Sequence, residues 1–148
     1  MASIRREVEI NRNPADVWDA IRDVGMIHQR LVPGFVVDCR LEEGGAARIV
    51  TFGNGMIVRE LIVDVDDATR RHAWAARTEM LEHYNASVQV FSIHGGSGGG
   101  SRGGGGKCRV VWIADLLPHD RAPAIAAMIE QGLEVMKRTL EANTSRGM

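Results

Sequence analysis

The sequence predicts an α+β fold in which a curved antiparallel sheet of seven strands wraps around one long C-terminal helix. Short apolar or alternating runs follow one another closely between turn-forming residues, which is typical of an antiparallel meander. Two short helices are expected between the first strand and the other six. Apolar residues at three- and four-residue spacing then predict a helix over residues 121–141, where Ile129, Leu133 and Met136 share one face.

The length and composition fit one domain that spans residues 1–148. The chain has 148 residues, of which 45% are hydrophobic, enough for a single core. Its 18 basic and 19 acidic residues give a formal net charge of −1, so nucleic acid is not expected as a partner. The sequence shows neither an apolar run of membrane-spanning length nor the apolar segment of a signal peptide. We expect a cytoplasmic protein without membrane insertion.

The first third of the chain predicts a strand followed by two short helices. Residues 3–10 alternate in polarity, as in a strand with one buried face. Asn13 is a suitable N-cap, Pro14 suits the first helical position, and the apolar stripe that follows ends at Gly25. A second, brief helical turn is expected at residues 26–31.

The middle of the chain predicts the remaining strands, with turn-forming residues such as those at 53–55 between them. Cys39 and Cys108 fall within these strands, where buried free thiols are expected rather than a disulfide. The strands are expected at residues 35–41, 46–52, 56–65, 71–76, 84–93 and 107–116.

Residues 94–106 consist almost entirely of glycine and serine, the composition of a flexible coil. The segment lies where a hairpin would join the last two strands. It is either a natural loop or an engineered linker that replaces a native turn. A phosphate-binding loop is disfavoured, because no Gly-Lys-Ser/Thr motif follows and Lys107 leads into a strand. We expect a flexible loop without a function.

The long helix has clear start signals and one position of low bulk. Pro118 ends the preceding strand, Asp120 can act as N-cap, and Pro123 suits the first turn. Gly132 lies on the apolar face, where glycine costs roughly 0.5–1 kcal/mol relative to alanine. With Ala124, it leaves this face short of bulk. Either the helix covers a hollow, or Gly132 packs closely against a strand.

Seven stretches carry a family resemblance, and the match covers nearly the whole chain apart from the glycine segment. The stretches are residues 13–18, 59–61, 65–67, 70–71, 83–87, 112–118 and the closing helix. Their order and spacing resemble the START/Bet v1-like (SRPBCC) superfamily, in particular its polyketide cyclase/dehydrase branch and the related plant abscisic acid receptors. The resemblance implies a helix-grip fold with an apolar cavity between the sheet and the last helix. It implies no single chemistry, because the superfamily includes lipid carriers, hormone receptors and cyclases.

The resemblance to the receptors implies individual cavity positions. Glu60 matches a glutamate that faces the cavity. The receptors' carboxylate-binding lysine appears here as Val37, and their gate loop appears as residues 52–55, so abscisic acid recognition is not expected. The other matched positions lie on the penultimate strand and the last helix: Tyr84, Ala86, Ala124, Met128 and Gly132.

Strand alternation supports an inward Glu60 without reference to the family. Val58 and Glu60 share one face of their strand, while Arg59 and Leu61 share the other. Both faces are largely apolar, so one of the two charges must be partly buried. A carboxylate in an apolar cavity could act as a general acid or base, or could bind a polar ligand group. The alternative is an ion pair with a nearby arginine such as Arg48.

Three other residues are candidates for contact with a ligand. Tyr84 shares an apolar face with Ala86 and Val88, so its hydroxyl either orients a ligand or bonds a main-chain carbonyl. His28 lies near the expected mouth of the cavity, where it either shuttles protons or is merely packed. Trp112 either contacts a ligand or fills the core. No metal site or cofactor is expected, since no HExxH motif, Cys/His cluster or nucleophile elbow is present.

Three functions remain open from these observations. The leading one is binding of a hydrophobic small molecule, polyketide-, lipid- or isoprenoid-like, with polar contacts from Glu60 and Tyr84. The second is a cyclase, aromatase or dehydratase that uses Glu60 as general acid or base, assisted by Tyr84 or His28. The third is a ligand-free interaction module with a filled core, such as a homodimer. The expected apolar wall consists of Val37, Ala86, Val88, Trp112, Met128 and Gly132.

Overall fold

In the computed structural model, which describes residues 2–93 and 106–146, seven strands form one antiparallel sheet in the order β1-β7-β6-β5-β4-β3-β2. The strands are β1 (Ala2–Ile10), β2 (Val36–Glu42), β3 (Ala47–Phe52), β4 (Ile57–Asp66), β5 (Arg71–Ala76), β6 (His83–Ser92) and β7 (Cys108–Leu117). The helices are α1 (Pro14–Arg22), α2 (Ile27–Arg30) and α3 (Ala122–Arg146). The expected α+β helix-grip fold is confirmed.

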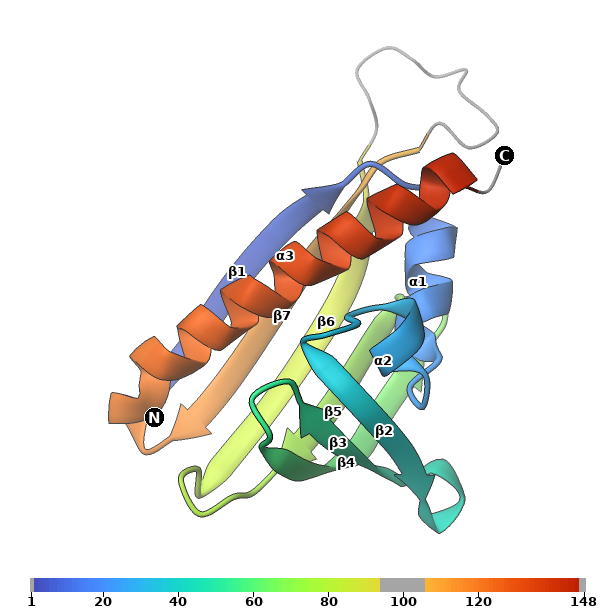
Figure 1. The fold of residues 1–148 in the computed structure, drawn as a ribbon. Coiled ribbons are helices and arrows are strands. Elements are labelled where there is room, and N and C mark those ends of the chain that lie inside the picture. Colours follow the sequence, from blue (N-terminus) through green and yellow to red (C-terminus); the bar gives the residue numbers. More distant parts are fainter. Residues whose placement is uncertain (1, 94–105, 147–148) are drawn as a thin grey trace.

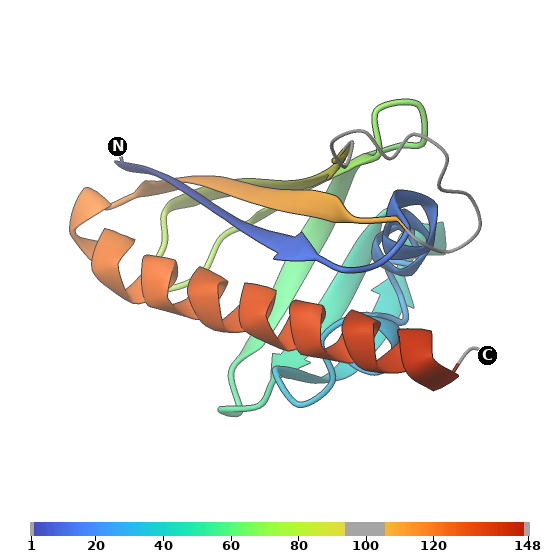
Figure 2. The ribbon, with the colours of Figure 1, turned by 90° about the horizontal axis from the view of Figure 1, so that it is seen from above.

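The helix α3 crosses one face of the sheet, and the two edges of the sheet relate to it differently (Figure 1). Strands β1 and β7 run along α3 in both views, whereas β2, β3 and β4 diverge from it (Figures 1 and 2). The helix α3 contributes four buried side chains to the core: Ile129, Leu133, Met136 and Leu140.

Local sequence signals explain where α1 begins. The Asn13 side chain accepts a hydrogen bond from the backbone N–H of Ala15 at 2.7 Å, and Pro14 is the first helical residue. The helix ends at Arg22, earlier than the expected Gly25. Trp18 and Arg22 both donate to the carboxylate of Asp67, which attaches α1 to the β4–β5 turn.

The predicted N-cap of the long helix is wrong. Asp120 lies inside a 3-10 turn, His119–Arg121, that precedes α3, and Pro118 is the residue that caps this turn. The two cysteines are confirmed as buried free thiols. Residues 94–105 lie outside the described part of the chain, so the flexible glycine loop stays a prediction.

Residues 2–93 and 106–146 contain neither a candidate membrane-spanning helix nor a candidate metal-binding cluster. No helix there is long and apolar enough to cross a membrane. No cluster of histidine, cysteine and acidic side chains in the same ranges could hold a metal ion.

Candidate functional site

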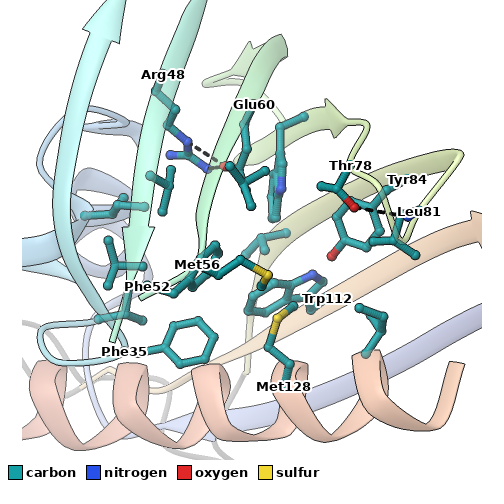
Figure 3. A pocket seen from close by; sticks show the side chains of 18 of the residues that line it. Phe35, Arg48, Phe52, Met56, Glu60, Thr78, Leu81, Tyr84, Trp112 and Met128 are labelled. Atoms are coloured by element: carbon teal, nitrogen blue, oxygen red, sulfur yellow. Dashed lines mark hydrogen bonds and ion pairs between the residues drawn. The ribbon is translucent and has the colours of Figure 1, made fainter. Parts of the chain in front are cut away.

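A pocket of about 240 Å³ lies between the sheet and the N-terminal part of α3. Its wall is mostly apolar and includes residues from strands β2 to β7, from α1 and α2, and from the loops that border them. Figure 3 shows aromatic and methionine side chains around the hollow, among them Phe35, Phe52, Met56, Trp112 and Met128.

Small residues in the sheet leave room for the aromatic rings beside this pocket. Ala76 lies directly between Glu60 and Tyr84 across neighbouring strands, and Ala86 lies beside Trp74. A methyl side chain cannot rise far above the sheet. The Trp74 and Trp112 rings meet edge to face, with their centroids 5.7 Å apart.

The pocket wall contains a buried ion pair. Arg48 and Glu60 lie opposite each other on β3 and β4, only 3% and 6% exposed, and the Arg48 Nε and Nη2 atoms are each 2.8 Å from Glu60 Oε1. Arg48 also donates to the carbonyl oxygen of Val24 at 3.0 Å, which the early end of α1 leaves free of helical bonding. Of the two alternatives for Glu60, the structure shows the ion pair, although the residue still lines the pocket. A catalytic role would require Glu60 to act from within this pair.

His72 is a neutral base in the wall. Its ring stacks on Trp74 at a centroid distance of 5.0 Å, and its Nδ1 lies 3.1 Å from the carbonyl oxygen of Asp64. Since a carbonyl only accepts, Nδ1 carries the proton. Burial, and then the positive charge of Arg48, lowers the pKa of His72 to about 4. The other ring nitrogen, Nε2, is buried without a hydrogen-bond partner among the described residues.

Tyr84 and Trp112 present two more polar atoms without partners. The residues are 6% and 7% exposed, and neither the Tyr84 hydroxyl nor the Trp112 indole N–H forms a hydrogen bond within residues 2–93 and 106–146. Burial, and then the negative charge of Glu60, raises the pKa of Tyr84 far above its usual value. The phenol therefore stays protonated. The main-chain bond considered for a core Tyr84 is not observed.

Six of the residues singled out from the sequence line the pocket: Glu60, Tyr84, Val88, Trp112, Ala124 and Met128. Two others lie behind its surface. Ala86 is buried in the sheet, and Gly132 is covered by aromatic rings. A Cβ atom at Gly132 would lie 3.1 Å from Trp112 Cζ3 and 3.2 Å from the Phe35 ring, so this glycine is closely packed, the second of the two alternatives.

The expected wall position of Val37 needs correction. A register shift between Val36 and Asp38, typical of a β-bulge, interrupts the alternation of β2. Val36 is consequently 2% exposed and lines the pocket, whereas Val37 is 53% exposed. His28 is half-buried on α2 and is not part of the pocket lining, so the structure does not bring it together with Glu60 and Tyr84.

His72 and the loop residues at the pocket mouth were not among the residues predicted from the sequence. The alternation of β5 was the available signal for His72, because it shares a face with Trp74 and Ala76. The mouth includes the loop between β5 and β6, in which the Thr78 hydroxyl accepts bonds from the backbone N–H groups of Met80 and Leu81. Loop residues have no periodicity that would indicate their direction.

Comparison with known proteins agrees with the fold. A structure of the protein XoxI from Bacillus cereus is similar, with 19% identity over 93% of this chain and 94% of the other and a TM-score of 0.77. A protein from Thermobifida fusca is 25% identical over 90% of this chain and 85% of its own, with a TM-score of 0.66. A START superfamily protein from Mycobacterium smegmatis is 9% identical over 99% of both chains, with a TM-score of 0.67.

A search of proteins with curated functions found no significant match. The di-domain ARO/CYC protein BexL from the BE-7585A biosynthetic pathway is also structurally similar, at 14% identity over 95% of this chain and 47% of BexL, with a TM-score of 0.70. The family model described as "Polyketide cyclase / dehydrase and lipid transport" matches residues 1–141. The chain therefore belongs to the polyketide cyclase/dehydrase and lipid transport family.

Proposed function

We propose that this protein binds a hydrophobic small molecule, polyketide-, lipid- or isoprenoid-like, in the pocket between the sheet and α3. The observation that carries the proposal is a mostly apolar pocket of about 240 Å³ with a few buried polar groups in its wall. Such pockets bind ligands mainly by removing apolar surface from water, at about 25 cal/mol per Å² before ordering costs. The description of the family, which includes lipid transport, supports the same class of ligand.

The proposal can be tested by blocking the mouth of the pocket. Ala124 lines the pocket and is exposed, so a tryptophan there would obstruct the mouth without entering the packed core. Ala127 is exposed on α3 and is not part of the lining, which makes Ala127→Trp a matched control. A neutral fluorescent probe, N-phenyl-1-naphthylamine, would be titrated into each protein.

We expect Ala124→Trp to weaken probe binding at least about tenfold, because the ring occupies the space that the probe needs, and Ala127→Trp to leave it unchanged. Equal binding by the two variants, or no binding by the wild type, would contradict the proposal. Native mass spectrometry of protein purified from its own host would identify a natural ligand.

A second candidate is a cyclase, aromatase or dehydratase that uses Glu60 as general acid or base. The observation that favours it is a carboxylate in the pocket wall beside a protonated Tyr84. Glu60→Gln separates the two functions. An enzyme would lose turnover of a polyketide-like substrate while still binding it, whereas a carrier would change only modestly in affinity.

The third hypothesis is a ligand-free interaction module. It predicts that side chains fill the interior and that no apolar ligand raises the melting temperature. A homodimer stays a prediction that sedimentation analysis can check.

A further inference from the structure

Three buried polar atoms of the pocket wall lack hydrogen-bond partners among the described residues: Tyr84 Oη, Trp112 Nε1 and His72 Nε2. Buried polar groups in folded proteins are almost always hydrogen-bonded, so three unpaired ones around one pocket need an explanation. A fourth such atom, Nδ1 of His28, belongs to a residue outside the lining. A bound molecule that forms hydrogen bonds with these atoms would explain why they have no partner in the described part of the protein.

Two of these atoms are donors that lie near each other. Tyr84 and Trp112 are on the neighbouring strands β6 and β7, and the Tyr84 hydroxyl points toward the indole nitrogen in Figure 3. The indole N–H of Trp112 is close enough to the Tyr84 hydroxyl to lower the pKa of Tyr84 in part, as a hydrogen-bond donor does, but the two groups do not meet the geometry of a hydrogen bond with each other. An indole N–H only donates, and a protonated phenol can donate as well. His72 Nε2 can only accept, so it is not part of this donor pair.

The charges around the donor pair disfavour an anion as its partner. Arg48 is bonded to Glu60 and to a backbone carbonyl, so its charge is already compensated. The negative charge of Glu60 acts on Tyr84 and would repel an anion there. Arg121 also lines the pocket but is exposed. A buried anion beside the donor pair would therefore lack a counter-ion, whereas a neutral oxygen needs none.

We infer that the ligand is a neutral molecule with an acceptor oxygen, such as a ketone, ester or lactone carbonyl, and that the Tyr84 hydroxyl and the Trp112 N–H bind this oxygen. The inference rests on the proposed function, since it names the polar group of the same hydrophobic ligand. The apolar wall provides most of the affinity, and the donor pair selects among apolar molecules of similar shape. A ligand without the oxygen leaves both buried donors unpaired. This penalty discriminates between ligands more strongly than the net gain from the hydrogen bonds themselves.

A matched pair of probes tests this inference. 2-Acetylnaphthalene and 2-ethylnaphthalene have nearly the same shape and differ in the carbonyl oxygen. Calorimetric titration would give the ratio of their dissociation constants for the wild type, Tyr84→Phe and Trp112→Phe. Trp18→Phe is the control, because the Trp18 indole N–H already donates to Asp67 and the residue is not part of the pocket lining. Comparing ratios between proteins cancels the difference in hydrophobicity of the two probes.

We expect the preference for the ketone to fall about tenfold in Tyr84→Phe and in Trp112→Phe, and to stay unchanged in Trp18→Phe. A second readout uses the wild type alone and so does not depend on how the variants fold. In ¹H–¹⁵N spectra, the indole proton of Trp112 should move downfield with the ketone and not with the hydrocarbon.

Other outcomes would overturn the inference in distinguishable ways. If both probes bind with the same ratio in every protein and the indole proton does not respond, hydrophobic binding stands and the role of the donor pair is refuted. If neither probe binds the wild type, the proposed function fails and the inference fails with it. Tighter binding of 2-naphthoate than of the ketone would show that the pocket selects an anion instead.

Discussion

The two ends of α3 meet the sheet in different ways. From its middle toward its C-terminus, Leu133 and Leu140 are buried in the core on the sheet, beside strands that run alongside the helix, and neither lines the pocket. Toward its N-terminus, Ala124 is exposed, Met128 is only partly buried, and both line the pocket. The buried ion pair and the unpaired donors also line this pocket. One end of α3 therefore stabilises the fold, which leaves the space at the other end free for a ligand.

The largest effect on stability is expected at the buried ion pair. Glu60→Leu leaves the guanidinium of Arg48 buried without its carboxylate, and breaking such a pair typically costs about 3–5 kcal/mol. The double variant Arg48→Met/Glu60→Leu removes both charges and should recover much of that loss. Urea unfolding of the three proteins measures the difference. A loss below about 1 kcal/mol for Glu60→Leu would mean that water already solvates the pair.

A pair of truncations compares the two ends of α3 directly. Leu133→Ala removes a side chain from the packed end and should cost about 2–5 kcal/mol, because the surrounding residues cannot close the cavity. Met128→Ala removes a half-buried side chain that already borders empty space, so it should cost less than about 1.5 kcal/mol. Chemical denaturation of both variants gives the comparison. Similar costs at the two positions would contradict the difference in packing.

The neutral His72 predicts a loss of stability in mild acid. Its pKa of about 4 in the fold lies below the ordinary 6.5, because burial and Arg48 disfavour the charged ring. The unfolded chain therefore takes up a proton below pH 6.5 that the folded chain does not, and stability is lost progressively as the pH falls toward 4. Between pH 7.5 and 5 the loss from this group is about 2 kcal/mol.

Unfolding at the two pH values, for the wild type and His72→Phe, measures this contribution. The carboxylates of Asp19 and Asp67 do not interfere, because hydrogen bonds from arginines lower their pKa values below 3.8 and they stay ionised at pH 5. The free energy of unfolding of His72→Phe should depend less on pH than that of the wild type. The same pH dependence in both proteins would mean that another titratable group causes it.

The smallest effect on stability is expected at Gly132, in the middle of α3, between the part that lines the pocket and the part that packs on the sheet. Alanine favours the helix by about 1 kcal/mol, but its Cβ would press on the Phe35 and Trp112 rings. Both rings line the pocket, so the space into which a small shift would move them is open. Gly132→Ala should therefore change stability by less than about 1 kcal/mol while weakening probe binding. Calorimetry and probe titration test the two parts, and a loss above about 2 kcal/mol would mean that the rings cannot move.

Periodicity in the sequence predicted the fold well. The seven strands and the long helix were confirmed because apolar residues recur at two-residue spacing in the strands and at three- and four-residue spacing in the helix. The same alternation placed Glu60 on the inner face. Val37 was placed in the wall by the family resemblance, and it is exposed because a β-bulge shifts the register of β2 at this position, which leaves no clear mark in the sequence.

The polar chemistry of the site was harder to predict than its backbone. The ion pair of Glu60 depends on the register of β3 against β4, which places Arg48 opposite it, and register is a tertiary property. The unpaired states of Tyr84 and Trp112 depend on which atoms surround them in three dimensions. Sequence periodicity shows which face a side chain occupies, and not whether its polar atom finds a partner there.

The most direct test of the account is a crystal structure of the protein under xenon pressure, because dry apolar cavities in proteins bind xenon. We expect xenon between Trp112, Phe52 and Met128, in the space that the pocket occupies, and none beneath the C-terminal end of α3. Side chains that fill this space and exclude xenon, with α3 packed equally along its length, would contradict the hollow on which the proposed binding depends.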